Sequence, residues 1–393
     1  PDGENNFTDS NGRGGFRFEP PSGFVSLCTA NMKDSEYATI GPNSTTASDQ
    51  HFDTILWTGD GKDNRRIGGL NFQPDLVMEV VRSDNDAMAP AVYDSVRGVG
   101  RAVMTGAANA QNLNASDGTI KSFNADGFTV GFGSPATSVN GINKTSSNYV
   151  AWCWKAGNET VEDGTGTILV SRSTNVDAGF SIIHYTKNGI AGSTISHGLG
   201  KAPEFQMFKP MAGGVDWAVY HITMTATNYM KTGASGDTVS TASSLPWNDV
   251  EPDANFITLG SAGNTNGTAA GKYVCYAWTG IEGFSKFGSY VGNNTTDNAF
   301  VYLGFKPAFV IIKGTAASRG WSLHDNKRMP YNGTDGPILT FNLSKNEAYF
   351  SGNQVDFCSN GFKIRNAGNY QGEAETYVYA AWAEMPFKYA TAR

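Results

Sequence analysis

The chain has 393 residues, of which 17% are charged, 12% are aromatic and 47 are glycine. This length fits about two to four domains, and the composition suits short strands and tight turns better than long helices. The formal net charge of -7 argues against a nucleic-acid-binding protein, which normally presents a basic stripe, and no apolar run is as long as a membrane span.

The first 50 residues differ from the rest and predict an irregular leader. The N-terminus is polar and lacks the apolar stretch of a signal peptide. Glycines and prolines at Arg13–Gly15 and Pro20–Gly23 mark turns, and Lys33–Gln50 is polar. We expect this segment to pack against a neighbour or to link to something upstream, and we expect no membrane insertion.

Three β-rich segments follow, and the same four anchors occur in each in the same order. The first anchor is an aromatic residue, and the second is a leucine that comes 13, 14 and 13 residues later and precedes a proline. Proline is tolerated at the first residue of a strand, so each proline is expected to open the apolar run after it. The three sets are Trp57, Leu70 and Pro74; Tyr185, Leu199 and Pro203; and Tyr290, Leu303 and Pro307.

The third and fourth anchors close each segment. A Gly-Phe or Asn-Phe corner is a hairpin signal, because such turns need positive φ. The corners are Gly127-Phe128, Asn255-Phe256 and Gly361-Phe362. The closing motif has Tyr-Val first and Trp sixth, and it runs from Tyr149 to Trp154, from Tyr273 to Trp278 and from Tyr377 to Trp382. The closing tryptophans are 124 and 104 residues apart, which is too long for a solenoid repeat and typical of independent domains.

These anchors predict an all-β fold of three tandem antiparallel β-sandwich units of about 100 residues each, preceded by an irregular N-terminal segment. The expected boundaries are 1–50 for the leader and 51–157, 165–281 and 282–393 for the units. Ala156–Gly166 reads as a linker between the first two units, and Thr279–Gly283 joins the last two almost directly. We expect each unit to bury its own interior, so that only edges and tips remain free for contact.

The four cysteines show neither metal spacing nor a disulfide framework. Cys153 and Cys275 lie in apolar runs, where buried free thiols are common. Cys28 and Cys358 complete the set, and no CxxC pair occurs. We expect four reduced thiols and assembly in a cytoplasm, although single bridges remain open.

The sequence predicts no catalytic, cofactor-binding or metal-binding residues. No HExxH pair, GxSxG elbow or P-loop occurs. His221 and His324 follow Trp217 and Trp321 at similar places, and we interpret them as strand-end histidines satisfied by the backbone rather than as catalytic groups. The other histidines are His51, His184 and His197.

Charged residues cluster in three places, which we interpret as solvated turns, linkers or loops rather than as glycosidase carboxylates. The turn from Asp60 to Asp63 could hold a weakly bound ion, although the calcium-loop pattern is absent. The clusters are Asp60, Lys62, Asp63, Arg65 and Arg66; Glu159, Glu162 and Asp163; and Glu373 and Glu375.

The polar segment before each closing strand is the best candidate for recognition, because loops on a rigid β scaffold commonly bind partners. Asn, Ser, Thr and Tyr side chains there could bind sugar hydroxyls, while a plain solvent-exposed connection is an equally good interpretation of any single loop. The segments are Ser134–Asn148, Ser261–Lys272 and Asn366–Glu375.

The pattern resembles a tandem-repeat module of phage structural proteins, which are common in phages of marine and cyanobacterial hosts. The matching motifs are YVAWCWKAG, GFSIIHYT, GLGKAP, GFSKFGSY, YLGFKPAFVIIK and AAWAEMPFKYATAR. The resemblance covers residues from about 55 to 393 and is most specific at Pro386–Ala390 with Arg393. The second unit departs from it with an insertion around Ser235–Trp247.

A second resemblance concerns the leader. Gly15–Phe24, with Leu27, Thr29 and Asn31, resembles the end of a lectin-like β-sandwich domain that lies upstream in such proteins. That domain is missing here, or the chain is a fragment that starts after it. The resemblance implies no enzyme activity and supplies no assigned binding residues.

Together, the repeats, the missing active-site motifs and the resemblance predict a non-enzymatic virion structural protein, a phage tail fibre or adhesin that displays loops for host-surface recognition. The resemblance implies self-association as a homotrimer, contact with other virion proteins and binding of a host-surface glycan, with no nucleic acid and no cofactor. Two alternatives stay open: a capsid decoration or head-fibre protein, and a polysaccharide depolymerase. The expected location is the virion, after assembly in the host cytoplasm.

Overall fold

The computed structural model describes residues 7–26, 39–41, 44–83, 90–106, 108–111, 118–132, 142–232, 239–240, 245–267, 271–316, 320–333, 335–343, 347–351, 355–368 and 370–385. These residues form strands β1 to β27 and two short 3-10 turns, η2 (Ser48–Gln50) and η4 (Ile222–Met224). The all-β class predicted from the sequence is therefore confirmed.

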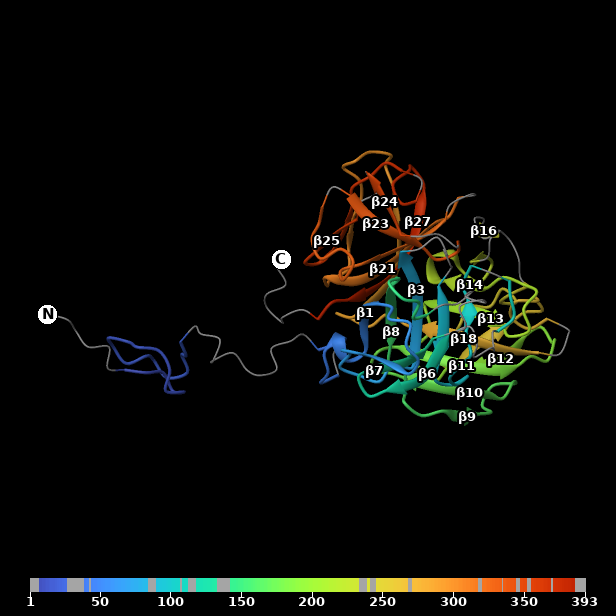
Figure 1. The fold of residues 1–393 in the computed structure, drawn as a ribbon, viewed down its shortest axis with the longest axis horizontal. Coiled ribbons are helices and arrows are strands. Elements are labelled where there is room, and N and C mark those ends of the chain that lie inside the picture. Colours follow the sequence, from blue (N-terminus) through green and yellow to red (C-terminus); the bar gives the residue numbers. More distant parts are fainter. Residues whose placement is uncertain are drawn as a thin grey trace.

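Three large antiparallel sheets make up most of the molecule (Figure 1). The first large sheet contains, in spatial order, β1 (Phe52–Thr58), β8 (Asn148–Trp154), β3 (Leu76–Ser83), β4 (Ala91–Asp94) and β5 (Val103–Met104). The second contains β9 (Val161–Asp163), β10 (Val170–Asn175), β11 (Phe180–Thr186), β18 (Lys272–Trp278), β13 (Phe205–Pro210), β14 (Ala218–His221), β15 (Tyr229–Lys231) and β16 (Val239–Ser240). The third contains β19 (Ser285–Val291), β27 (Thr376–Ala383), β21 (Pro307–Gly314), β22 (Trp321–Asp325), β23 (Asp335–Thr340) and β24 (Ala348–Ser351).

Each large sheet has a small antiparallel sheet formed by the intervening residues. The first small sheet consists of β2 (Arg65–Gly68), β7 (Gly127–Gly131) and β6 (Thr119–Asn124). The second consists of β12 (Ser193–Ser196) and β17 (Phe256–Leu259), and the third of β20 (Phe300–Tyr302), β26 (Gly361–Ile364) and β25 (Val355–Cys358).

The first and last anchors are cross-strand partners in all three large sheets. Trp57 pairs with Tyr149, and their rings stack with centroids 5.1 Å apart. The equivalent pairs are Tyr185 with Tyr273, at 5.5 Å, and Tyr290 with Tyr377, at 5.2 Å. Stacked aromatic pairs of this kind stabilise the sheet beyond the area they bury. The matching register gives a structural basis for comparing positions between the three sheets.

Between each large sheet and its small sheet lies a hydrophobic interior. In the first, the Trp57 ring meets Phe128 of β7 edge-on at 5.8 Å. In the second, Ile195 and Ile257 are fully buried, and in the third the Tyr290 ring meets Phe362 at 6.1 Å. The inward residues alternate with outward ones along each small strand, as expected for a strand with one buried face.

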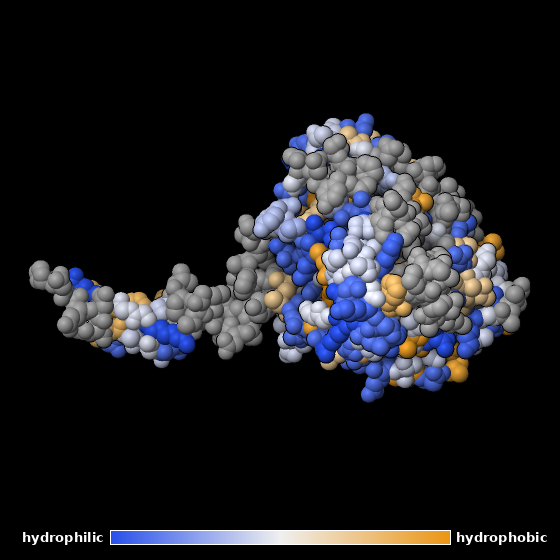
Figure 2. All heavy atoms as spheres, in the orientation of Figure 1, coloured by the Kyte–Doolittle hydropathy of each residue, from blue (hydrophilic) through white to orange (hydrophobic). Residues whose placement is uncertain are grey.

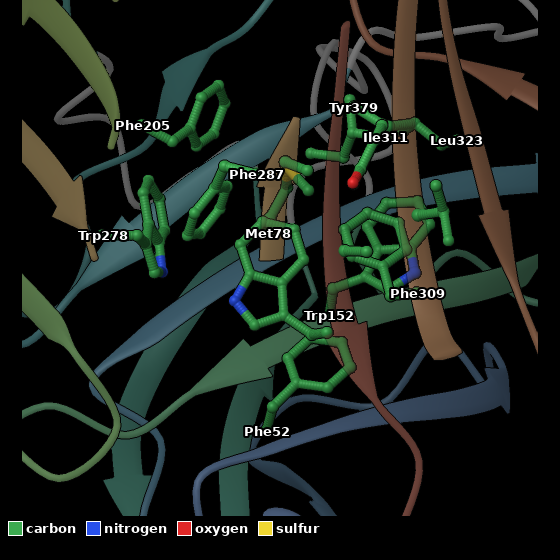
Figure 3. Packing of buried hydrophobic residues seen from close by; sticks show 14 of the residues in the cluster. Phe52, Met78, Trp152, Phe205, Trp278, Phe287, Phe309, Ile311, Leu323 and Tyr379 are labelled. Atoms are coloured by element: carbon green, nitrogen blue, oxygen red, sulfur yellow. The ribbon is translucent and has the colours of Figure 1, made fainter. Parts of the chain in front are cut away.

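The opposite faces of the three large sheets share a single central core. The closing tryptophans Trp154, Trp278 and Trp382 meet there edge to face, with ring centroids 5.2 to 6.0 Å apart. Figure 3 shows Phe52, Trp278 and Phe309 around this core, and each of the three comes from a different large sheet. The three sheets are therefore packed against one another through their aromatic faces.

The expectation that each unit buries only its own interior is wrong for these faces. In β8, Ala151 and Cys153 point into the first interior, whereas Val150, Trp152 and Trp154 point into the central core. A strand with both faces buried carries an uninterrupted apolar run instead of alternation. On the face of the molecule seen in Figure 2, the coloured surface is by contrast mainly hydrophilic, with small separate hydrophobic patches.

Three polar contacts link the large sheets in a closed ring. Each is made by the last residue of β4, β14 or β22, which occupies an equivalent position in its sheet. Tyr276 Oη donates to Asp94 Oδ2 at 2.6 Å, His221 Nε2 lies 3.0 Å from Tyr379 O, and Trp152 Nε1 donates to Asp325 Oδ2 at 3.2 Å. The first sheet thus contacts the second, the second contacts the third, and the third contacts the first.

Two positional matches made from the sequence are shifted by one residue. Ile257, not Phe256, faces inward opposite Ile195, as Phe128 does in the first small sheet. Likewise His221 occupies the place of Asp325, not that of His324. A shift of one residue moves a side chain to the other face of a strand, so the burial of each residue decides the match.

The end of the leader and the expected linker contact the large sheets. Ile40 is buried in the central core, and Ser48 Oγ donates to Glu384 O at 2.9 Å beyond the end of β27. The expected linker Ala156–Gly166 includes β9, and the Ala156 amide donates to Asp75 Oδ2 at 2.7 Å. The predicted unit boundaries stay predictions, and the motif Pro386–Ala390 with Arg393 lies outside the described residues, as does Cys28.

Candidate functional site

A pocket of about 370 Å³ lies beside the second large sheet, next to the chain segment that connects β5 and β6. It is lined by Ala108, Gly214, Val215, Asp216, Tyr229, Lys231, Leu245, Ala262, Gly263 and Asn264. Its volume is at the lower end of the range for small-molecule sites, and its lining mixes an aromatic ring with charged and amide groups.

A two-glycine turn between β13 and β14 brings the two sides of this pocket together. Gly213 and Gly214 have φ angles of 75° and 86°, which other residues rarely adopt. The Gly214 amide donates to Ala108 O at 2.7 Å, and a Cβ on Gly213 would lie only 2.4 Å from Ala110 N. Glycine at these positions therefore allows the segment after β5 to form one wall.

Strand β15 supplies the aromatic ring and the cation. Tyr229 and Lys231 are half-buried and flank the fully buried Met230, so both side chains lie on the same side of the strand. The Lys231 ammonium lies 5.6 Å from the centre of the Tyr229 ring, which is cation–π distance. The indole of Trp321 on the third sheet donates to Lys231 O at 2.9 Å and holds the backbone of this strand.

The opposite wall carries the carboxylate. Asp216 follows the glycine turn, and Lys209 lies buried behind it in β13, where its ammonium donates to Val215 O at 3.2 Å. Burial lowers the pKa of Lys209 to about 8, and the attraction of the Asp216 carboxylate opposes this effect. The pocket lining therefore carries one carboxylate, Asp216, and one ammonium group, Lys231.

The amide wall is formed by a loop that buried tyrosines hold in place. Tyr273 Oη donates to Gly263 O, and Tyr185 Oη donates to Thr265 O at 2.6 Å. Both rings belong to the hydrophobic interior beside the second large sheet, where burial raises the pKa of Tyr273 to about 12. Asn264 is thereby fixed at the pocket by the core beneath it.

Of the three polar loops predicted for recognition, the second contributes to this pocket through Ala262, Gly263 and Asn264. The described parts of the other two have structural roles. Asn143 is buried and donates to Asp60 Oδ1 at 2.7 Å, and Asn298 donates to Asn366 O at 2.9 Å. Sequence reasoning missed Tyr229, Lys231 and Asp216, because their approach depends on pairing between β14 and β15 and on the glycine turn.

His221 and His324, the two histidines weighed as candidates from the sequence, are both buried and hydrogen-bonded. His221 bonds to Tyr379 O, and burial lowers its pKa to about 4. The expected backbone partner is wrong for His324, whose Nε2 lies 2.9 Å from Gln371 Oε1 and 3.2 Å from Ser322 Oγ, both side-chain atoms. Burial, with the nearby Arg328, lowers the pKa of His324 to about 3. Within the part of the chain that the structure describes, no three His, Cys, Asp or Glu side chains gather in a way that could hold a metal ion.

Asp60, Asp63 and Asp163, from two of the charged clusters considered from the sequence, are held in ion pairs and hydrogen bonds. Asp60 accepts from the Lys62 backbone amide at 3.0 Å and lies 3.6 Å from Arg65 Nη1, and Asp63 pairs with Lys121 at 2.6 Å, so that both carboxylates of this turn have partners within the protein. Asp163 is not the solvated carboxylate we expected. Burial raises its pKa, but hydrogen bonds from Thr165, Ser196 and Arg172 outweigh burial and hold the pKa well below its usual range.

A comparison with known protein families finds one match, which covers residues 47–386 and is described as a domain of unknown function, DUF7483. The chain belongs to the DUF7483 family. The DUF7483 match begins just before η2 and extends beyond β27, so it includes all three large sheets and the pocket. No curated protein matches the chain. Among the residues that the structure describes, no helix is long and apolar enough to cross a membrane.

Proposed function

We propose that this chain is a non-enzymatic structural protein of a virus particle, a phage tail fibre or another adhesin, and that the pocket beside the second sheet holds a glycan of the host surface. The observation that carries the proposal is the convergence of Tyr229, Lys231, Asp216 and Asn264 on one pocket of about 370 Å³. An aromatic ring can face the apolar side of a sugar while amide and charged groups bond its hydroxyls.

The rigidity of the site supports the same function. Its walls are fixed by the glycine turn, by strand pairing and by the buried tyrosines beneath the loop, so little ordering is needed when a ligand binds. We further propose that the chain self-associates, as a homotrimer, and assembles with other virion proteins in the host cytoplasm. Several copies of a weak sugar site would then act together through their effective concentration.

The binding part of the proposal is tested with the double variant Tyr229→Ala and Lys231→Ala on an array of bacterial surface polysaccharides. We expect at least about a tenfold loss of binding, because an aromatic anchor and a charge-assisted donor are both removed. The control is Tyr331→Ala, which removes a tyrosine that is 82% exposed and does not line the pocket. Equal binding by both variants would contradict a glycan site in this pocket.

The location is tested by antibody labelling of purified particles in electron micrographs. Label on the tail supports a fibre, and label on the head supports the alternative of a capsid decoration or head fibre. Detection only in the lysate of infected cells, never on particles, would overturn the virion assignment. Release of shorter glycans during incubation with the pure chain would favour the depolymerase alternative instead.

A further inference from the structure

The outer face of the third small sheet carries two exposed aromatic side chains that the packing of the fold does not require. On β20, Val301 is buried, while Phe300 and Tyr302 on either side of it are 47% and 60% exposed. Alternation places both rings on the face that points away from the sandwich interior. Large exposed aromatics that lie close together on a monomer surface commonly mark a binding surface.

The outer face of the third small sheet differs from the outer faces of the other two small sheets in its residues. Val301 pairs with Phe362 as Ile67 pairs with Phe128, so the three strands can be matched residue by residue. The residues that match Phe300 and Tyr302 are Arg66 and Gly68 in β2, and Thr194 and Ser196 in β12. The same scaffold therefore forms with polar residues or glycine at both positions.

Both rings are positioned by neighbours before any ligand binds. A Cβ on Gly361 would lie 3.2 Å from Phe300 Cζ, so the ring lies close over this glycine. The Lys286 ammonium lies 5.4 Å from the centre of the Tyr302 ring and donates to Tyr302 O at 2.9 Å. An aromatic side chain held in this way loses little conformational entropy on binding.

The surroundings of the two rings indicate the chemistry of the ligand. Lys363 pairs with Phe300 across the sheet, and its ammonium contacts Asp297 at 2.6 Å, while Asp356 contacts Arg365 at 3.5 Å. Positive and negative groups therefore alternate beside the rings, which disfavours the phosphate backbone of a nucleic acid. Aromatic faces with mixed polar groups at their edge fit a sugar ring, which has an apolar C–H face and a rim of hydroxyls.

We infer that the outer face of the third small sheet, around Phe300 and Tyr302, is a second saccharide-binding surface, which stacks pyranose rings against these two aromatics and bonds their hydroxyls through Lys363 and Asp356. The surface lies on another sheet than the pocket and shares no lining residue with it. It extends the proposed glycan recognition but is tested separately from the pocket.

The test uses the full chain with Phe300→Thr and Tyr302→Ser, which introduces the residues that the matching strand β12 already carries. The probes are an array of hexose and N-acetylhexosamine oligosaccharides and, separately, poly(dT). We expect binding to the oligosaccharides to fall about tenfold or more, with unchanged circular dichroism and unfolding midpoint. In a pocket variant, Tyr229→Ala, we expect part of the oligosaccharide binding to remain and to disappear when the β20 changes are added.

The outcomes separate this inference from the proposed function. Loss of binding in Tyr229→Ala alone, with full binding in the β20 variant, would overturn the second surface and leave the pocket. Full binding in Tyr229→Ala with loss in the β20 variant would support the second surface and contradict the pocket. Binding of poly(dT) but no sugar, a change of oligomeric state in the β20 variant without a change in sugar binding, or no sugar binding by the parent chain would overturn the inference.

Discussion

The indole N–H of Trp152 donates to the carboxylate of Asp325 at 3.2 Å, although 173 residues separate them in the chain. Both groups are buried, and the same carboxylate also accepts from the guanidinium of Arg328. The Arg328 guanidinium in turn lies 5.7 Å from the Trp152 ring. This contact joins the third large sheet to the first, and it places a buried ion pair beside the central core.

Removal of the carboxylate from this pair is expected to destabilise the fold strongly. Asp325→Ala leaves the fully buried Arg328 with only Glu347 as its acid partner, and breaking a buried ion pair costs about 3–5 kcal/mol. Urea unfolding measures the loss. The control is Asp126→Ala, whose pair with Arg66 is solvent-exposed and contributes less than about 1 kcal/mol. Similar losses in both variants would show that the buried pair has no special role.

The sequence was sufficient for the aromatic anchors but not for this ring of contacts. Trp57 and Tyr149 could be found because aromatic and β-branched residues mark strands, and the structure pairs them directly. The match of His221 with Asp325 was missed by one residue, since Asp and His fill the same position and each of these side chains bonds to a distant strand. The uninterrupted apolar run from Tyr149 to Trp154 was a usable signal for a strand buried on both faces.

The shared core predicts that the three large sheets unfold together. Trp278 contacts Trp154 and Trp382, so Trp278→Ala opens a cavity that all three sheets border, with an expected cost of about 3–5 kcal/mol. Hydrogen exchange followed by mass spectrometry reports each strand separately. We expect protection to fall by the same factor in β8, β18 and β27. Independent domains would instead lose protection in the second sheet alone.

Glu79 makes stability depend on pH in an unusual direction. It lies in β3 at the position of Phe208 and Ile312 in the other sheets, and burial raises its pKa from 4.5 to about 8. The folded state therefore keeps a proton that the unfolded chain has already released. As a result, stability is lost as the pH rises from about 4.5 to about 8, by up to about 1.4 kcal/mol per pH unit.

The variant Glu79→Gln removes this proton linkage. We expect it to be more stable than the parent chain at pH 8, with a difference that shrinks toward zero as the pH falls to about 4.5. Unfolding midpoints measured at several pH values provide the comparison. Glu162→Gln makes the same substitution at an exposed side chain on β9 and serves as the control. A constant difference between Glu79→Gln and the parent at all pH values would rule out the linkage.

The glycine at the third corner is needed for close approach between two strands. A Cβ on Gly361 would lie 2.0 Å from Val301 O, and a Cβ on the matching Gly127 would lie 2.1 Å from Ile67 O. Gly361→Ala must therefore push β20 away from β26, which we expect to cost about 1–3 kcal/mol. Among the described residues, no atom lies within 4 Å of the Cβ position of Gly333, so Gly333→Ala is the matched control, with an expected change within about 0.5 kcal/mol. Equal stability of the two variants in urea unfolding would show that the corner accepts a side chain, and the backbone contact would then not explain the glycine.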